Sequence, residues 1–276
     1  MKIDRVRCLP ERRSGCAPPR GQITGAQGMR WLAQRETLRV SKLWTQTVLA
    51  PVISALLFIL VFGLSLGDRV RNVGTVEYDQ FIVPGLIAMA MVQAAFANNA
   101  STIFQARSER YINDILSSPM HPWQMTIGFV VGGVFRGLLI GGSLLAAALL
   151  LTGVPFENPA ALALTTVLCL VLFAAFGTVV GIYAESWDNT TFIGNIVILP
   201  LAFVGGTFYS VALLPSPWEE LSHFNPIFYM VQAMRFGLLG ESDVSIWLSL
   251  GVTAALAIPA YLWAQWLFSS GHKLKA

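Results

Sequence analysis

The sequence predicts an all-α polytopic membrane protein with six transmembrane helices. Of its 276 residues, 55% are hydrophobic and only 12% are charged, and the mean hydropathy is +0.62. Soluble domains carry about 25% charged residues, so this chain lacks the polar surface needed to face water on every side. Its apolar residues also gather in long runs, and a run of about 20 residues crosses the hydrocarbon core as a helix.

Six such runs define the predicted spans. They cover residues 47–66, 81–104, 124–151, 160–184, 191–208 and 245–268. The third run is longer than a bilayer requires, which favours a tilted helix. Residues 28–276 are therefore expected to form one transmembrane domain. Residues 1–27 lack the apolar core of a signal peptide, and their arginines, prolines and glycines predict a disordered tail.

The distribution of basic residues predicts the orientation of the spans. Of 18 lysine and arginine residues, 14 lie in residues 1–46, in the loop after the second span and in the C-terminal tail. Three lie on the opposite side, and Arg136 falls inside the third span. Cytoplasmic loops are enriched in lysine and arginine. Both termini, and the loop at residues 108–123, are therefore expected in the cytoplasm.

Residues 29–44 predict an N-terminal interfacial helix in front of the first span. Its apolar members are Trp31, Leu32, Leu38, Leu43 and Trp44, and its basic members are Arg30, Arg35, Arg39 and Lys42. This combination is typical of a helix that lies in the plane of a membrane surface. Lipid phosphates account for the basic residues without nucleic acid. The bilayer is therefore an expected partner, and nucleic acid is not.

A polar island interrupts the apolar sequence between the second and third spans. In residues 108–123, charged and apolar side chains alternate as in a short amphipathic helix. The charged ones are Glu109, Arg110 and Asp114, and the apolar ones include Ile115 and Leu116. Mixed charge suits a protein better than lipid, so the island is a candidate for docking in a groove of another protein. The alternative is a solvated loop helix without a partner.

Residues 207–243, on the predicted outer side, contain apolar stretches that are too short to cross a bilayer. Prolines at 215, 217 and 226 interrupt them. We predict a re-entrant or interfacial hairpin, because irregular backbone at membrane depth must be buried in protein or line water. The hairpin serves as an outer gate or as a lid that seals the bundle. The gate candidates are Gly205, Gly206, Phe208, Tyr209, Asn225 and Pro226.

Four polar residues recur at helical spacing on one face of the second span. They are Asn98, Ser101, Thr102 and Gln105. Such a stripe either lines a hydrophilic conduit or joins helices through hydrogen bonds. The sequence leaves both interpretations open.

The third span carries a ridge of small residues and one charge. Gly133, Gly137 and Gly141 recur every four residues, which predicts close packing against another helix. Arg136 is an ionisable residue inside a span and hence a functional candidate. The alternative is that its side chain reaches the interface along its apolar stem. The sequence assigns no specific role to it.

No enzyme or metal site is evident in the sequence. A phosphate-binding loop of the G-x-x-x-x-G-K-[ST] type is absent, since no glycine precedes a lysine. The three cysteines and three histidines are scattered and show no metal-ligand spacing. We therefore expect a non-catalytic chain that holds no metal and no cofactor of its own.

Five stretches between Trp44 and the C-terminus resemble a known family. They are WTQTVLAPVISALLF, QFIVPGLIAMAMV, INDILSSPM, GGVFRGL and GGTFYSVALLPSPWEELSHFNPIFYMVQAMRFGLLG. Together they are similar to ABC-2 type permeases, the membrane subunits of ATP-binding-cassette exporters of the type V class. The resemblance implies six spans per subunit, two identical or different subunits per transporter, and a bacterial plasma membrane location. It also implies a separate ABC ATPase subunit that binds the ATP.

The resemblance further implies that the island is the coupling helix that docks on the ATPase, with residues 185–189 as a second contact. The implied coupling residues are Glu109, Arg110, Asp114, Ile115, Leu116, Ser118, Pro119, Glu185 and Asp188. Family members often line their conduit with the first, second and fifth spans. The exported cargo is expected to be lipid-, glycan- or drug-like, and the sequence does not select among these. An ion-coupled carrier and a non-transporting membrane scaffold are the alternative functions.

Overall fold

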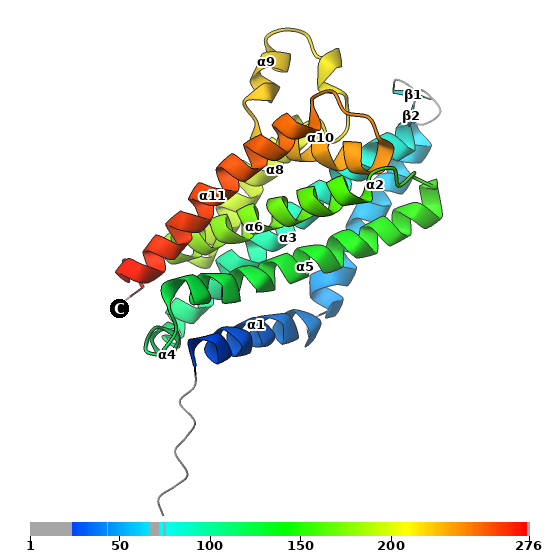
Figure 1. Ribbon diagram of the computed structural model, residues 1–276. Coiled ribbons are helices and arrows are strands. Elements are labelled where there is room, and N and C mark those ends of the chain that lie inside the picture. The colour runs from blue at the N-terminus through cyan, green and yellow to red at the C-terminus, as the bar shows by residue number, and fades with distance from the viewer. Residues whose placement is uncertain (1–23, 43, 67–71, 74–75, 275–276) are drawn as a thin grey trace, which may run out of the picture.

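The computed structural model describes residues 24–42, 44–66, 72–73 and 76–274. Within these ranges the chain is almost entirely helical (Figure 1). The exception is a short antiparallel ladder between β1 (Asn72–Val73) and β2 (Val76–Glu77). Most of the predicted tail lies outside the described residues, and residues 25–27 form the first turn of helix α1 (Gly25–Lys42).

In the part of the chain that the structure describes, five helices are long and apolar enough to cross a membrane. They are α3 (Tyr78–Ser108), α5 (Pro122–Thr152), α6 (Pro159–Tyr183), α11 (Ile246–Ser270) and the composite helix Trp187–Val204. The composite helix joins α7 (Trp187–Phe192), the π-helical η2 (Ile193–Ile198) and α8 (Leu199–Val204). These five correspond to the second to sixth predicted spans, so the chain is a multi-pass membrane protein.

The first predicted span is divided between a π-helical turn, η1 (Thr45–Leu49), and α2 (Ala50–Leu66). Pro51 lacks the N–H that would bond to the carbonyl of Thr47, and its ring crowds that carbonyl. The helix widens at this point, as π turns do within α-helices. The 17 residues of α2 extend about 25 Å at 1.5 Å per residue. By itself α2 is therefore shorter than the ~30 Å hydrocarbon core. That the first predicted span also crosses the membrane, which would bring the number of crossings to six, stays a prediction.

Three short helices lie between α8 and α11. They are η3 (Val211–Leu213), α9 (Trp218–His223) and α10 (Pro226–Leu239). Asn225 caps α10, because its Oδ1 accepts a hydrogen bond from the N–H of Ile227 at 3.0 Å. Gly240 ends the helix in the left-handed region, with φ at 75°. α10 packs against α3, α6 and α11 and buries most of its residues, so the segment folds back onto the bundle.

The predicted short helix between α3 and α5 is present as α4 (Ile112–Leu116). Arg110 adopts a left-handed conformation, with φ at 63°, and so ends the preceding helix. His121 and Gln124 form a capping box at the start of α5, and Pro122 occupies the first turn, where no N–H is needed. The polar island is therefore a compact loop: Arg110 ends the helix before it, and the capping box begins the helix after it.

α3 occupies the centre of the bundle, between α5, α6 and α10. The glycine ridge of α5 allows this close arrangement. A Cβ atom at Gly133 would lie 2.6 Å from Oδ1 of Asn99 and 2.9 Å from Cβ of Ala174. Gly137 and Gly141 meet side chains of α6 and α3 just as closely. The prediction that the ridge serves helix packing is therefore confirmed.

Figure 1 shows which elements share an end of the bundle. α4 and the C-terminal end of α11 lie at one end, which we call the α4 end. α9 and the β1–β2 ladder lie at the opposite end, the α9 end. α1 runs beside the first half of α5, with Leu32 against Gly128 and Glu36 against Gly132. The predicted coupling and gate segments consequently lie at opposite ends of the molecule.

Candidate functional site

The α4 end exposes all three charged residues of the predicted coupling helix, Glu109, Arg110 and Asp114. Pro119 is exposed as well. Ile115 is only 8% exposed and packs in an apolar cluster with residues of α1, α3, α5 and α11. Leu116 lies half-buried at the edge of this cluster, and the hydroxyl of Ser118 donates to the carbonyl of Ile115 at 2.5 Å. A partner would therefore meet the charges and Leu116, while Ile115 holds α4 to its own bundle.

The turn between α6 and α7 reaches the same end and shares a cavity with α4. The cavity has a volume of about 320 Å³, and its lining includes Arg110, Asn113, Glu185 and Lys273. Nζ of Lys273 lies 3.9 Å from Oε1 of Glu185. Asp188, in the first turn of α7, is exposed nearby. Both segments predicted to contact an ATPase thus border one hollow.

Polar contacts tie this hollow to the long helices. Nη1 of Arg107, in the last turn of α3, donates to the carbonyls of Gly181 at 3.3 Å and Ala184 at 2.9 Å, at the end of α6. The guanidinium of Arg35, in α1, lies 4.6 Å above the ring of Tyr111. α1, α3 and α6 are thereby joined around α4. The loop that carries α4 is therefore fastened to three long helices by side-chain contacts.

A buried polar network joins α1, α3 and α6. Nη2 of Arg39 donates to Oδ1 of Asn98 at 3.0 Å and also to the hydroxyl of Thr102. Nδ2 of Asn98 donates to Oδ1 of Asn99, whose own Nδ2 donates to the hydroxyl of Thr178 at 3.0 Å. These pairings offset the cost of burying amides away from water. The guanidinium of Arg39 is thus bonded to α3 while its side chain is still 30% exposed, and its contact with lipid phosphates stays a prediction.

The four residues of the predicted polar stripe occupy different surroundings. Asn98 and Thr102 bond to α1, as described. Ser101 lines a cavity of about 240 Å³ together with Arg136. Nε2 of Gln105 donates to Oε1 of Glu109 at 2.8 Å. Asn98 and Thr102 thus join helices, and Ser101 lines a cavity. Gln105 bonds to Glu109 of the predicted coupling helix.

Glu36 of α1 is a buried carboxylate that the sequence analysis did not single out. It is 1% exposed, and neither of its carboxylate oxygens has a hydrogen-bond donor among the described residues. Nη2 of Arg39 lies 3.4 Å from one oxygen, and Nε of Arg35 lies 3.8 Å from the other. Burial raises the pKa of Glu36 more than the two arginines lower it. The four-residue spacing of Leu32, Glu36 and Val40, the buried face of α1, is the pattern that points to it.

At the α9 end, the predicted gate residues form a tightly bonded turn. Gly206 has φ at 78°, and its carbonyl accepts a hydrogen bond from Nη2 of Arg235 at 2.8 Å. Nδ2 of Asn225 donates to the carbonyl of Leu201 at 2.5 Å. The start of α10 is thereby fastened to the end of α8.

The other gate candidates surround this turn. Gly205 caps α8, and Pro226 is the first residue of α10. The ring of Phe208 stacks on that of Phe203 with 5.2 Å between centroids, and the hydroxyl of Tyr209 donates to the carbonyl of Val204. All six candidates therefore lie at or next to the junction of α8 and α10, where a gate or a lid would have to move.

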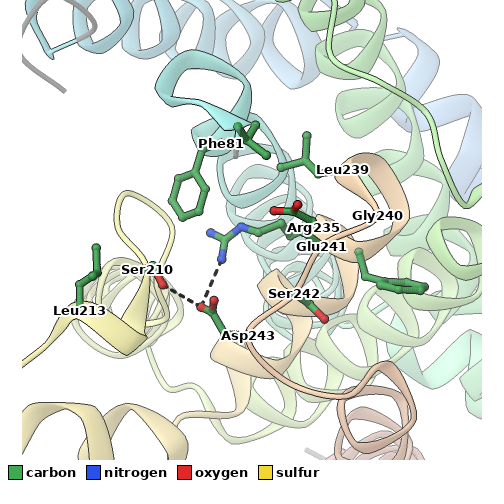
Figure 2. Close-up of a pocket in the computed structure, with 11 residues that line it drawn as sticks. Phe81, Ser210, Leu213, Arg235, Leu239, Gly240, Glu241, Ser242 and Asp243 are labelled. Carbon is green, nitrogen blue, oxygen red and sulfur yellow. Dashed lines mark hydrogen bonds and ion pairs between the residues drawn. The ribbon is translucent and has the colours of Figure 1, made fainter. Parts of the chain in front are cut away.

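A cavity of about 560 Å³ lies beside this junction, and Figure 2 shows residues that line it. The guanidinium of Arg235 lies 3.9 Å from the centre of the Phe81 ring, and its Nη1 lies 3.9 Å from Oδ2 of Asp243. The same oxygen accepts hydrogen bonds from Ser210 at 3.1 Å and from Gln232 at 2.7 Å. Arg235 thus contacts the turn at Gly206, α3 at Phe81 and the segment after α10 at Asp243, and so holds these three parts together. The sequence analysis counted Arg235 only as a basic residue and did not consider Asp243.

Comparisons with known proteins agree with this arrangement. Residues 27–239 match the model of the family described as ABC-2 type transporter. The chain belongs to this family. The inner membrane transport permease YadH of Escherichia coli strain K12 is 38% identical over 244 residues, which cover 88% of this chain and 94% of the relative. Nodulation protein J of Rhizobium leguminosarum bv. viciae is 25% identical over 241 residues, covering 86% and 93%. This ABC-2 protein is accordingly a membrane permease of an ABC transporter.

Proposed function

We propose that this ABC-2 protein is the permease subunit of a bacterial inner-membrane exporter for lipid-, glycan- or drug-like cargo. A separate ABC ATPase docks on its α4 end and holds the ATP. The observation that carries the proposal is that α4 and the turn between α6 and α7 border one cavity at that end. Two loops that are far apart in sequence thus offer one contiguous docking surface.

The surroundings of α4 suit the transmission of force. Arg107 ties the end of α3 to the end of α6, and Ile115 anchors α4 in the core. The exposed surface carries both signs of charge, because Arg110 and Glu185 line the hollow and Asp114 is exposed on α4. Complementary charge sets the register and the rate of association more than the affinity. A partner of defined shape therefore suits this surface better than a lipid headgroup.

The proposal places the α4 end in the cytoplasm. The basic residues of the N-terminal segment, of the α3–α5 loop and of the C-terminus support this orientation. η1 and α2 follow one another directly and supply the sixth crossing together, since a span needs about 20 residues. The junction of α8 and α10 then lies on the outer side as a gate.

A second copy of the chain completes the conduit in this proposal. α2 and the composite helix leave apolar side chains uncovered within the subunit, among them Ile53, Leu57, Ile196 and Val197. Two cavities open between these helices, α3 and α5. A pair of subunits that face one another across these helices would enclose both cavities, and lipid would cover the remaining apolar surface.

Charge reversal at an exposed coupling residue tests the proposal. We expect Asp114→Lys to reduce retention of the ABC ATPase by the permease in detergent, because the reversal opposes the charges that a partner presents to α4. Glu220→Lys is the matched control, since Glu220 is an exposed carboxylate of α9 at the opposite end. The measurement is pull-down of the ATPase, together with the rate of ATP hydrolysis of the complex in vesicles.

Each outcome decides between the functions under consideration. Loss of retention in Asp114→Lys alone supports an exporter that docks its ATPase on the α4 end. Equal retention in the parent and both variants would contradict this docking surface. A complex that assembles but hydrolyses ATP no faster than the free ATPase would favour a membrane scaffold. A permease that moves cargo along an ion gradient without any ATPase would favour an ion-coupled carrier.

A further inference from the structure

Arg136 lies near the middle of α5, about 21 Å along the helix from Pro122 at 1.5 Å per residue. It lines two cavities, one of about 460 Å³ and one of about 240 Å³. The cavities share Arg136, Gln93 and Ala97, so they adjoin at these three residues. An ionisable residue at such a position needs a partner, because a charge inside a membrane is costly.

The described part of the subunit supplies no such partner to Nε of Arg136. Nε of Arg136 and Nε2 of Gln93 are buried and have no hydrogen-bond acceptor among the described residues. The described linings of both cavities contain no aspartate or glutamate. Arg39 interacts electrostatically with Arg136 and adds positive charge. Two residues that line both cavities thus carry nitrogen donors without acceptors in the described chain, and the nearby charge of Arg39 favours an anion there.

Arg235 also has a buried Nε without a hydrogen-bond acceptor among the described residues, but other groups of the subunit surround its guanidinium. Its guanidinium donates to the carbonyl of Gly206, stacks over Phe81 and lies beside Asp243. Among the described residues, Arg136 has no ion pair with a carboxylate and no aromatic ring stacked on its guanidinium. The difference indicates that Arg136 is kept available for a group that comes from outside the subunit.

The two cavities differ in character. The larger one is mostly apolar, with Ala55, Phe58, Leu86 and Phe208 in its lining. The smaller one is more polar, with Ser101, Thr191 and Asn195. An amphiphile can therefore place its apolar body in the larger cavity and its polar group at their junction. Guanidinium groups bind carboxylate, sulfate and phosphate through paired, charge-assisted hydrogen bonds.

We propose that Arg136 and Gln93 bind the anionic group of an amphiphile whose apolar part occupies the larger cavity. The anionic group is a phosphate, a sulfate or a carboxylate. Its source is either the exported cargo or a phospholipid of the bilayer, and the cargo assignment rests on the proposed function. The binding site itself does not rest on the proposed function, because its residues all belong to one subunit.

Binding to the purified permease tests the site. The protein is held in a neutral detergent, and native mass spectrometry measures binding of dodecyl phosphate, of dodecyltrimethylammonium and of inorganic phosphate. We expect dodecyl phosphate to bind in preference to both other probes. Arg136→Gln should weaken its binding at least tenfold, and Gln93→Leu should weaken it by a smaller factor. Arg136→Lys should retain part of the binding, because the charge remains but the planar fork is lost.

Arg30→Gln is the matched control, because it removes an exposed arginine of α1 that lines neither cavity. It should bind dodecyl phosphate as the parent does. Equal binding by the parent and a folded Arg136→Gln, or equal binding of the cationic and anionic probes, would overturn the proposal. If Arg136→Gln fails to fold, Arg136→Lys and Gln93→Leu decide: parent-like binding in both would also overturn it.

A second arm distinguishes the two sources of the anion. The permease and its ATPase are placed in nanodiscs of phosphatidylcholine, with or without phosphatidylglycerol. Faster ATP hydrolysis on addition of dodecyl phosphate, lost in Arg136→Gln, supports binding of cargo at the site. Retention of phosphatidylglycerol by the parent and not by Arg136→Gln, without faster hydrolysis, supports binding of a bilayer lipid there. The binding arm uses no ATPase, so failure of ATPase docking and failure of the anion site give separate results.

Discussion

Glu36 is buried between α1 and α5, and the described residues offer no hydrogen-bond donor to its carboxylate. Burial raises its pKa above the ordinary value of 4.5, although Arg39 and Arg35 lower it. The folded protein therefore binds a proton at Glu36 more readily than the unfolded chain does. Its contribution to stability is complete below about pH 4.5 and is lost as the pH rises through the folded pKa.

Glu36→Gln tests this at the residue scale, because the amide has the shape of the protonated acid and no charge. We expect the apparent Tm of the parent in detergent to fall more between pH 4.5 and pH 7 than that of Glu36→Gln. Glu220→Gln, at an exposed carboxylate, serves as the control and should follow the parent. Equal slopes for the parent and Glu36→Gln would show that the carboxylate titrates as it does in water.

At the scale of a single helix, the face of α5 on which a glycine lies decides whether a larger side chain would fit there. Gly133 faces Asn99 and Ala174 at distances that leave no room for a side chain. Gly142 lies on the same helix and has no atom within 4 Å of the position that a Cβ would take. The two glycines therefore form a matched pair that separates packing from helix propensity.

We expect Gly133→Val to destabilise the permease by about 1–3 kcal/mol, the usual cost of forcing extra volume into a packed interior. Gly142→Val should cost far less, since the new side chain meets open space. Thermal unfolding in detergent and the yield of monodisperse protein measure both effects. A loss of stability in Gly142→Val as large as that in Gly133→Val would attribute the effect to the β-branched residue itself.

The elements also show what sequence patterns reveal and what they do not. Hydrophobic run length predicted five of the long helices, and the alternation around Asp114 predicted α4, because both depend on local periodicity. The π turn before Pro51 was not predicted, since it depends on one missing N–H within an apolar run. The environment of Ile115 was also not predicted. A surface anchor and a core anchor have the same amphipathic spacing, and only the cluster that the fold builds around Ile115 separates them.

At the scale of the whole molecule, residues that pair across distant helices were the least predictable. Arg39 and Asn98 are 59 positions apart and meet because α1 lies along α5 and reaches α3. Arg235 and Gly206 meet because α10 folds back beside the end of α8. No local pattern encodes such pairs. The arginines were visible in the sequence as charges in or near apolar segments, but their partners became identifiable only from the fold.

The proposed orientation of the molecule in the membrane rests on the distribution of lysine and arginine and is open to direct measurement. Ser117 lies in the exposed loop after α4, and Ser216 lies in the exposed segment before α9, at the two ends of the bundle. A cysteine at each position is tested in a chain whose Cys8 and Cys16 are replaced by serine. Cys169 is buried and needs no replacement.

We expect a charged maleimide added to intact cells to label Ser216→Cys and not Ser117→Cys, because the reagent does not cross the bilayer. After permeabilisation both should react, which shows that each thiol is accessible in the folded chain. The excess of lysine and arginine at the α4 end is the physical reason for the expectation. Labelling of Ser117→Cys in intact cells would place α4 outside the cell, where no ATPase that depends on cytoplasmic ATP could dock, and the proposed transmission of force through α4 would fail with it.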